Sequence, residues 1–554
     1  MSSSYDVIVI GGGVNGTGVL RDLALRGVKA ALFERNDLAF GASGNSSGMI
    51  HGGPRYLTMN PDVTYASCLD SGYIQSIAPH LLFRAPFIMP VARHVAARQE
   101  LDLLDAFFDV YDRYQPLKRG KPHTRLAGAD LGKLEPGLKG EFEGAVTFDE
   151  WGIDGVRLCV ANARDAAEHG SQIFVPYTVT ALVRDERGQV AGVDALDRVT
   201  GRTLRASAKL VVNATGAWGP LTTLLGALPE TALRVRPGKG VHLYFDRRLS
   251  NYAIMVKAID GRRVFIEPWQ NTSVIGTTDD DYYGDLDNVF STTDEARYLI
   301  EAIARVFPVV REARLIGTYS GVRPTLYEWG KAEDALSREH AIVDHETHGA
   351  RGLFSMIGGK LASYRIFAEE MTDVLCGSLN DKGRCTTMSA KLPGGDEIVP
   401  PQEIEATAGI DAISASRLVY RHGSRARGLA AQMANDPKLT EVVCSCEPVR
   451  RVEIHNAVKQ EWAFDVDSVA RRTRLGLGSC GGLHCAARCG AIVADLLEQS
   501  PACGRRMAYD FLERAAKHRS SVVRGTQLKN EAVAFAYRQS LLAIHPNATR
   551  ESET

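Results

Sequence analysis

Three cations, Arg55, Arg323 and Lys360, stand in glycine-rich segments from which a binding pocket could be built. Arginine can bind an anionic group through two parallel hydrogen bonds, so these cations could hold a negatively charged ligand. His51 has a reference pKa near neutrality, so it could accept a proton. Taken one at a time, the arginines could equally form surface ion pairs, and His51 could be a loop histidine with its hydrogen bonds satisfied.

Four of the ten cysteines fall into two tight pairs near the C-terminus. Cys444 and Cys446 form the first pair, and Cys480 and Cys485 form the second after a gap of 33 residues. Residues two apart in an extended segment point to the same side, so Cys444 and Cys446 could share one metal. Four thiolates suffice for an iron–sulfur cluster or for a structural zinc ion. Cys489, at helical spacing from Cys485, could be a substitute ligand or part of the core.

The elements that must position these side chains begin at the N-terminus. In chain order they are an apolar strand (7–10), the GxGxxG glycines Gly11, Gly13 and Gly16, a helix (17–26), a second strand (29–33) and Glu34. Such glycines let the backbone approach a pyrophosphate at a helix N-terminus, and the acid accepts hydrogen bonds from ribose hydroxyls. GxGxxG alone is a weak signal, but the whole order predicts a dinucleotide site.

Two later segments favour FAD over NAD as the dinucleotide. Residues 210–218 are a strand that runs into a turn of small residues, including Ala214 and Gly216, against which a nucleotide could pack. Residues 355–360 end in a glycine pair before an expected helix over 361–375. The N-terminus of that helix could stabilise the anionic side of a reduced flavin ring.

Bulk properties exclude several classes of protein. A chain of 554 residues predicts roughly three or four domains. Because 65 Lys and Arg balance 66 Asp and Glu, nothing indicates binding to nucleic acid or to an anionic surface. No segment approaches about 18 uninterrupted apolar residues, so we expect no spanning helix. Without a secretory signal pattern the chain is expected to be cytoplasmic, with thiols or metal ligands rather than disulfides.

Several further motifs in order give a specific resemblance. They are Ser47-Gly-Met-Ile-His-Gly-Gly-Pro-Arg-Tyr-Leu57, Val274-Ile-Gly-Thr-Thr-Asp279, Thr318-Tyr-Ser-Gly-Val-Arg-Pro324, Gly358-Gly-Lys-Leu-Ala-Ser-Tyr-Arg365 and Leu392-Pro-Gly-Gly395. On these residues the chain resembles the FAD-dependent glycerol-3-phosphate dehydrogenases, within the wider D-amino-acid-oxidase-like flavoprotein group, over nearly its whole length. Pro54 is a departure, because single-subunit members usually carry an apolar residue there.

The resemblance implies an α/β fold and an activity, the oxidation of sn-glycerol 3-phosphate to dihydroxyacetone phosphate. A Rossmann-like FAD-binding domain of the D-amino-acid-oxidase and glutathione-reductase type would comprise residues 1–85, 146–235 and 315–390. An antiparallel-sheet substrate (cap) domain would comprise residues 86–145 and 236–314. The implied substrate-site residues are His51, Arg55, Arg323 and Lys360. The implied FAD-binding residues are Gly11, Gly13, Gly16, Glu34, Ser47, Ala214, Gly216, Gly359 and Lys360.

The C-terminal part has a second resemblance. After a boundary at Val399-Pro-Pro401 a mainly helical domain is expected over 396–554, with the cysteine module at 440–495. The cysteine spacing and Arg471-Arg-Thr-Arg-Leu-Gly-Leu-Gly478 resemble the small [2Fe-2S] domain of the bacterioferritin-associated ferredoxin type. A domain of this kind follows the flavin domain in the large subunit of the anaerobic members of the family.

That resemblance implies that Cys444, Cys446, Cys480 and Cys485 hold a [2Fe-2S] cluster. Electrons would then pass one at a time to partner subunits and a quinone, with peripheral contact at the cytoplasmic face of the inner membrane. Two other functions stay open. One is a self-contained dehydrogenase or oxidase with zinc or no metal at the cysteines. The other is a non-catalytic flavin-binding subunit that serves assembly, against which the intact Arg55, Arg323 and Lys360 argue.

Overall fold

The N-terminal strand is the centre of the first sheet. In the computed structural model, which describes residues 3–331, 336, 339–381 and 383–542, β1 (Ser3–Ile10) pairs in parallel with β2 (Ala30–Phe33) and β9 (Thr203–Asn213). Val7 and Val9 pack into one apolar cluster, whereas Ile8 and Ile10 pack into another on the opposite face. The strand is a continuous apolar run because both of its faces are covered.

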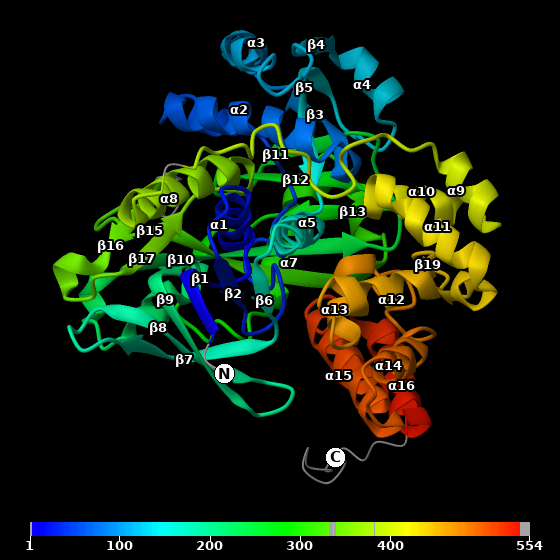
Figure 1. Cartoon of the computed structure of the whole chain (residues 1–554). Coiled ribbons are helices and arrows are strands. Elements are labelled where there is room, and N and C mark those ends of the chain that lie inside the picture. The colour runs from blue at the N-terminus through cyan, green and yellow to red at the C-terminus, as the bar shows by residue number, and fades with distance from the viewer. Residues whose placement is uncertain (1–2, 332–335, 337–338, 382, 543–554) are drawn as a thin grey trace.

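The first sheet joins segments that lie far apart in the sequence. Its order is β16-β17-β9-β1-β2-β6, with β7 and β8 attached beside β9. One face is packed by α1 (Val14–Leu25), α5 (Gly155–Glu168) and α8 (Tyr364–Leu379), as Figure 1 shows. The remaining strands are β6 (Gln172–Phe174), β7 (Tyr177–Arg184), β8 (Val190–Asp197), β16 (His340–Asp344) and β17 (Leu353–Gly358). The sheet thus combines strands from three separated stretches of the chain, residues 3–33, 172–213 and 340–358.

The second sheet has the order β14-β10-β13-β12-β11-β3-β5-β4, with β15 paired to β10. It is antiparallel except where β3 and β11 run in parallel, so it is mixed rather than purely antiparallel. Its strands are β3 (Leu82–Ala92), β4 (Thr124–Ala127), β5 (Phe142–Ile153), β10 (Val235–Phe245), β11 (Ala253–Lys257), β12 (Arg263–Trp269), β13 (Thr272–Gly276), β14 (Asp280–Asp281) and β15 (Leu315–Leu326).

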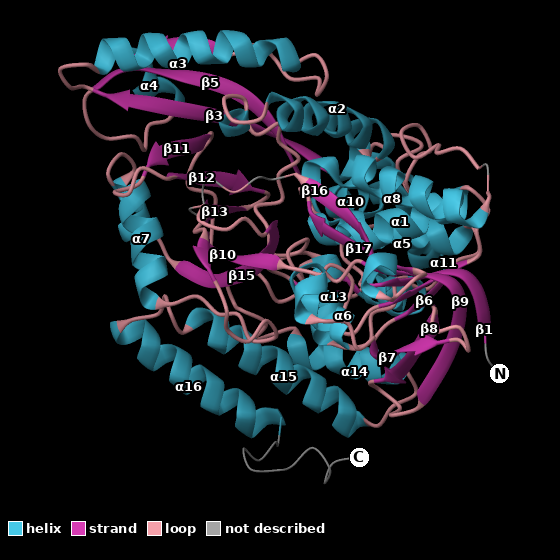
Figure 2. Cartoon of the chain, turned by 90° about the vertical axis from the view of Figure 1, so that its left-hand side faces the viewer, coloured by secondary structure: helices cyan, strands magenta, loops and turns pink. Residues whose placement is uncertain are grey.

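The position of β15 changes one expected boundary. Residues 315–326, assigned from the sequence to the FAD-binding segment 315–390, pair along their length with β10 of the second sheet. We therefore propose that the boundary between the substrate (cap) domain and the last FAD-binding segment lies after Leu326. The helices around the two sheets are α2 (Pro61–Ile77), α3 (Ala97–Tyr111), α4 (Gly128–Leu134), α6 (Gly219–Leu224) and α7 (Thr293–Ala304). Figure 2 shows α3 lying over β3 and β5.

The C-terminal part is mainly helical, as expected. Its elements are α9 (Pro401–Ala408), α10 (Ala412–His422), α11 (Ala426–Asn435), β18 (Val442–Cys444), β19 (Val449–Arg450), α12 (Arg451–Gln460), α13 (Val466–Thr473), α14 (Ala486–Leu496), α15 (Pro501–Arg519) and α16 (Gly525–Leu542). It packs on α5, which covers the first sheet, through α13, and on β15 of the second sheet through α15. Within the described residues, no helix combines the length and the apolar character that crossing a bilayer requires.

Candidate active site and cysteine site

One large cavity of about 870 Å³ lies between the two sheets. The GxGxxG turn, the residues after β2 and the turn after β9 line one end of it, and the loop 46–56 with strands β10, β12 and β15 lines the other. The carboxyl ends of parallel strands thus open into the cavity, which is where α/β sheets bind ligands. Of the residues expected from the sequence to form the active site and the FAD site, all but Gly16 line this cavity.

The glycine turn approaches the turn after β9 so closely that side chains would not fit. A Cβ on Gly11 would lie 2.7 Å from the carbonyl oxygen of Ala214, and φ at Gly11 is +108°. A Cβ on Gly16 would lie 2.0 Å from the carbonyl oxygen of Gly11. Gly11 and Gly13 therefore expose backbone to the cavity, whereas Gly16 allows α1 to pack against the turn.

Glu34 is held in place at the end of β2. Its Oε2 accepts a hydrogen bond of 2.7 Å from the backbone N–H of Gly12, and its Oε1 accepts one of 2.6 Å from that of Asn36. Burial raises the pKa of Glu34, against the effect of these two hydrogen bonds. The carboxylate is thereby oriented towards the nucleotide end of the cavity, where ribose hydroxyls can donate to its free lone pairs.

Arg55 and Lys360 meet at one aromatic ring at the other end. The guanidinium carbon of Arg55 lies 4.8 Å from the ring centroid of Tyr56, and Nζ of Lys360 lies 4.2 Å from it. Lys360 follows Gly358 and Gly359, whose φ angles of +77° and +82° favour glycine at both positions. The ring holds the two cations close together, so this end of the cavity attracts an anion.

Arg323 adds positive charge from β15. Its Nη1 donates to Asp279 at 3.0 Å and its Nη2 donates to Thr277 at 3.2 Å. Gly240 on the neighbouring strand makes room for it, because a Cβ there would lie 2.4 Å from Nη2 of Arg323. Arg263, at the start of β12, also lines the cavity and was not singled out from the sequence.

His51 lies among cations. Burial, and then the charges of Lys360, Lys118 and Arg55, lower the pKa of His51 to about 3, so its imidazole is neutral and can accept a proton. Lys118 is fully buried and forms a 2.6 Å ion pair with Glu150, whose carboxylate also accepts a 3.3 Å hydrogen bond from the N–H of Gly52. This buried pair supports the loop that carries His51, and nothing in the local sequence indicated it.

His242 is a second histidine in the cavity wall that the sequence did not single out. Its Nε2 lies 2.9 Å from Oγ of Ser47, and its ring stacks on Tyr319 at 4.6 Å between centroids. Burial, followed by the charge of Arg323, lowers the pKa of His242 to about 3. The alternation of β10 could have indicated it, because His242 shares a face with Gly240, which also lines the cavity.

The four paired cysteines come together as two thiol pairs. Cys444 lies beside Cys485, and Cys446 lies beside Cys480. Backbone N–H groups of Gly476 and Glu447 point at the sulfur of Cys444, and those of Gly482 and His484 point at the sulfur of Cys480. In the part of the chain that the structure describes, no three His, Cys, Asp or Glu side chains converge on one metal position.

Within this group the cysteines differ in burial. Cys444 and Cys485 are buried, whereas Cys446 and Cys480 are partly exposed. The neighbouring thiol of Cys485 lowers the pKa of Cys444, so Cys444 is the first of that pair to become a thiolate. Cys489 packs in the apolar core of the C-terminal helices, where burial raises its pKa. This placement favours a core role for Cys489.

A chain of contacts joins the cavity to the cysteine site. A Cβ on Gly48, next to the cavity residue Ser47, would lie 3.5 Å from Nε1 of Trp269. The guanidinium of Arg474 lies 4.4 Å from the ring of Trp269, and its Nε donates to Glu447 at 3.1 Å. Glu447 is fully buried, and its own N–H points at the sulfur of Cys444. The second sheet and the cysteine site are thus linked through Arg474 and Glu447.

Comparisons with known proteins agree with this arrangement. The chain matches the family described as FAD dependent oxidoreductase over residues 6–365, and the C-terminal domain of alpha-glycerophosphate oxidase over residues 385–503. One subunit of the anaerobic glycerol-3-phosphate dehydrogenase of Escherichia coli (strain K12) is 32% identical over 497 residues, 89% of this chain and 88% of that protein. A glycerol-3-phosphate dehydrogenase of a Synechocystis strain is 32% identical over 86% of this chain and 90% of its own length.

A solved structure shares the fold over nearly the whole chain. It is the glycerol-3-phosphate dehydrogenase from Bacillus halodurans complexed with FAD, which is 24% identical, covers 94% of this chain and 96% of its own, and has a TM-score of 0.75. The FAD-bound L-alpha-glycerophosphate oxidase from Mycoplasma pneumoniae is 19% identical and covers 71% of this chain and 99% of its own, with a TM-score of 0.52. The sequence matches and the cavity together show that this chain belongs to the family of FAD-dependent glycerol-3-phosphate dehydrogenases.

Proposed function

We propose that the chain oxidises sn-glycerol 3-phosphate to dihydroxyacetone phosphate with FAD. The electrons would leave through a [2Fe-2S] cluster to partner subunits and a quinone. The observation that carries the proposal is that one cavity begins at the GxGxxG turn and ends among Arg55, Arg323 and Lys360. A dinucleotide and a doubly charged substrate therefore have adjoining places in the same space.

The residues at the nucleotide end fit FAD. Gly11 packs so closely against the turn after β9 that it can carry no side chain, the backbone of Gly11 and Gly13 is open to the cavity, and Glu34 is oriented in advance by two backbone hydrogen bonds. When bound, FAD supplies a two-electron acceptor for the hydride that leaves the carbon bearing the hydroxyl group. Gly11 and Gly13 present backbone to its pyrophosphate, and Leu361 and Ala362, at the start of the α8 region, line the cavity beside Lys360.

The chain's own side chains then bind the substrate and move one proton. Arg55 and Arg323 bind the phosphate dianion, and Lys360 orients the hydroxyl-bearing end. The hydroxyl proton passes to an imidazole nitrogen of His51. A bound dianion offsets the charges of Lys360 and Arg55, which are among the causes of the low pKa of His51. Substrate binding therefore raises that pKa and makes His51 a stronger base when the substrate is present.

The cysteine site supports one-electron transfer. Four thiols in two pairs match the ligand number of a [2Fe-2S] cluster, and the pKa of Cys444 is lowered by the neighbouring Cys485 and by the N–H groups of Gly476 and Glu447, which favours its thiolate. The contacts through Trp269, Arg474 and Glu447 connect this site with the second sheet, other residues of which line the cavity. The partly exposed Cys446 and Cys480 are accessible to a partner. Peripheral association with the cytoplasmic face of the inner membrane, through such partners, belongs to the same proposal.

An absorption spectrum of anaerobically purified protein tests the proposal. Glycerol 3-phosphate should bleach the flavin, glycerol without the phosphate should not, and a broad iron–sulfur band should remain under the flavin bands. A flavin that glycerol 3-phosphate leaves oxidised would contradict the substrate assignment. Iron and acid-labile sulfide, measured on the same sample, separate the cluster from the zinc or metal-free alternative. Oxygen consumption on adding substrate separates an oxidase from a dehydrogenase.

A further inference from the structure

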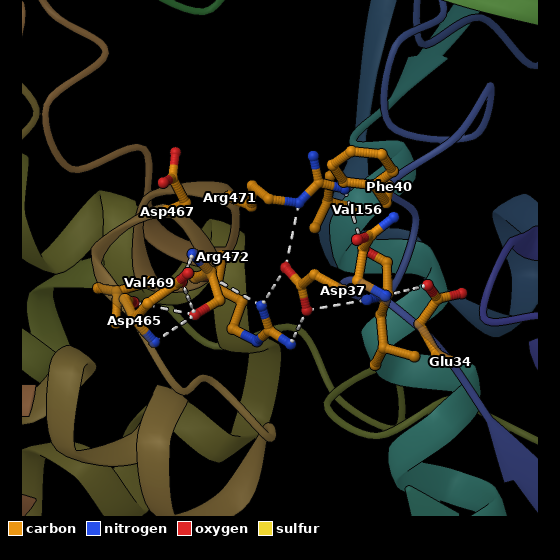
Figure 3. A network of polar contacts seen from close by, with 12 residues as sticks. Glu34, Asp37, Phe40, Val156, Asp465, Asp467, Val469, Arg471 and Arg472 are labelled. Carbon is orange, nitrogen blue, oxygen red and sulfur yellow. Dashed lines mark hydrogen bonds and ion pairs between the residues drawn. The ribbon is translucent and has the colours of Figure 1, made fainter. Parts of the chain in front are cut away.

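The loop after β2 is tied to the C-terminal helices by a buried carboxylate. Asp37 is 4% exposed and lies three residues after Glu34. Its Oδ1 accepts a 2.8 Å hydrogen bond from Nη2 of Arg472, and its Oδ2 accepts one of 2.9 Å from Nη1 of Arg472 and one of 3.1 Å from Nε of Arg471. Figure 3 shows Asp37 between the two arginines on one side and Glu34 on the other.

Arg472 is a rigid partner for this carboxylate. It is 1% exposed, its Nε donates to the carbonyl of Glu461 at 2.7 Å, and its Nη1 also donates to the carbonyl of Ser468 at 2.8 Å. Hydrogen bonds within the C-terminal domain therefore fix the orientation of the guanidinium that binds Asp37. Its two parallel hydrogen bonds to Asp37 fix the loop after β2 relative to α13.

Arg471 holds the next part of the same loop. Its Nη2 donates to the carbonyl of Leu38 at 3.0 Å, and its guanidinium lies 5.9 Å from the ring of Phe40, which lines the cavity. The N–H of Ala39 donates to the carbonyl of Gly12 at 2.8 Å. The loop that α13 holds is therefore in direct contact with the glycine turn.

The two arginines also control charge beside Glu34. The carboxylate of Asp37 acts on Glu34 in the same direction as burial, raising its pKa. Glu34 accepts ribose hydrogen bonds best when it is ionised. Arg471 and Arg472 neutralise Asp37, so they limit this effect as well as fixing the loop.

We infer that Arg471 and Arg472 are positioning residues of the FAD site: the C-terminal domain completes the nucleotide end of the cavity, and docking of α13 and binding of FAD stabilise each other. The inference rests on FAD occupying that end and does not require a metal at the cysteines. Coupling of this kind is reciprocal, so FAD must strengthen the docking of α13 by the same factor by which docked α13 strengthens FAD binding.

The first test is FAD affinity, measured by quenching of flavin fluorescence on titration of the apoprotein. Arg472→Gln should raise the dissociation constant for FAD on the order of tenfold to a hundredfold, because it leaves Asp37 buried without its main partner. Asp37→Asn combined with Arg472→Gln should recover part of that loss, because no unpaired charge remains. The matched control is Arg514→Gln, which breaks a 3.3 Å ion pair with Asp467 in the same domain and should leave FAD affinity within twofold.

The second test needs no variant. Hydrogen exchange of α13 in the full chain should slow when FAD is added, whereas exchange in α9 to α11 should not change. Equal exchange of α13 with and without FAD would overturn the inference, and so would wild-type FAD affinity in Arg472→Gln. A chain that binds no FAD at all would instead contradict the proposed function, so the two failures are distinguishable.

Discussion

The guanidinium of Arg474 lies 4.4 Å from the ring of Trp269, and this contact joins the C-terminal helices to the second sheet. Arg474 is 6% exposed and its Nε is paired with Glu447, which is fully buried. Arg471, Arg472 and Arg474 all bind groups within the chain, since Asp37 and Glu447 accept their hydrogen bonds.

Arg474→Gln should destabilise the protein by up to about 3–5 kcal/mol, because the buried Glu447 carboxylate loses its nearest cation and keeps only Arg417 at 3.9 Å. The double variant Arg474→Gln, Glu447→Gln should recover most of the stability that Arg474→Gln loses. The melting temperature measured by circular dichroism checks both, with Arg311→Gln as the control. Arg311 and Glu301 form an exposed pair, whose loss should cost less than about 1 kcal/mol. Equal melting temperatures for Arg474→Gln and Arg311→Gln would contradict the importance of the contact.

The same contact makes a prediction about electron flow. In Arg474→Gln, flavin bleaching by glycerol 3-phosphate should keep its rate, because the substrate end of the cavity is unchanged. Reduction of the proposed cluster should slow. Anaerobic stopped-flow absorption follows the two bands separately. Slower bleaching with unchanged cluster reduction would contradict the proposed route.

Arg323→Ala should lower kcat/KM for glycerol 3-phosphate on the order of tenfold to a hundredfold, because a charge-assisted hydrogen bond contributes about 1.5–3 kcal/mol. FAD content should stay at the wild-type level, since Arg323 lies at the substrate end of the cavity. Steady-state kinetics with an artificial acceptor and the flavin-to-protein absorbance ratio provide the two measurements. Normal turnover by Arg323→Ala would show that Arg323 does not bind the substrate phosphate.

His242 gives a prediction about pH. It is 1% exposed, and its folded-state pKa is lowered to about 3, below its ordinary value of about 6.5 in the unfolded chain. Between these two values the unfolded state binds the extra proton, so stability is lost as the pH falls from about 6.5 towards 3. The loss from this residue is about 2 kcal/mol at pH 5.

His242→Gln should therefore flatten the fall of melting temperature with decreasing pH. The matched control is His94→Gln, because the His94 side chain is half exposed. That variant should follow the wild-type curve. A His242→Gln protein whose melting temperature falls as steeply as that of the wild type between pH 7 and 5 would refute this assignment.

The cysteines give a compositional prediction. Cys444→Ser and Cys480→Ser should each lose most of the iron and acid-labile sulfide, because each removes a proposed ligand whose sulfur receives backbone N–H groups. Cys489→Ala should keep both, because Cys489 packs in the apolar core. Cys489→Ala should instead lower the melting temperature, because the substitution removes a side chain from that core. Iron that disappears from Cys489→Ala but persists in Cys480→Ser would reassign the ligands.

The sequence by itself determined the nucleotide end of the site, because that end is local. Strand, glycine turn, helix and acid occur within 34 consecutive residues, and their spacing fixes which backbone groups face the pyrophosphate. The family motifs likewise indicated Arg55, Arg323 and Lys360, which do line one cavity. Spacing alone also grouped the four cysteines into one candidate site, but only the fold shows that Cys444 lies beside Cys485 and Cys446 beside Cys480.

Only the tertiary structure decided which side chains from distant segments meet. His242 reaches the cavity because β10 and β15 pair over eleven positions, and Lys118 reaches Glu150 through the packing of the loop after α3 against β5. The hydrogen bonds from Arg471 and Arg472 to Asp37 span more than 430 residues of sequence. Such contacts depend on how whole elements pack, and no local pattern of residue types encodes them, so they had to be read from the folded chain.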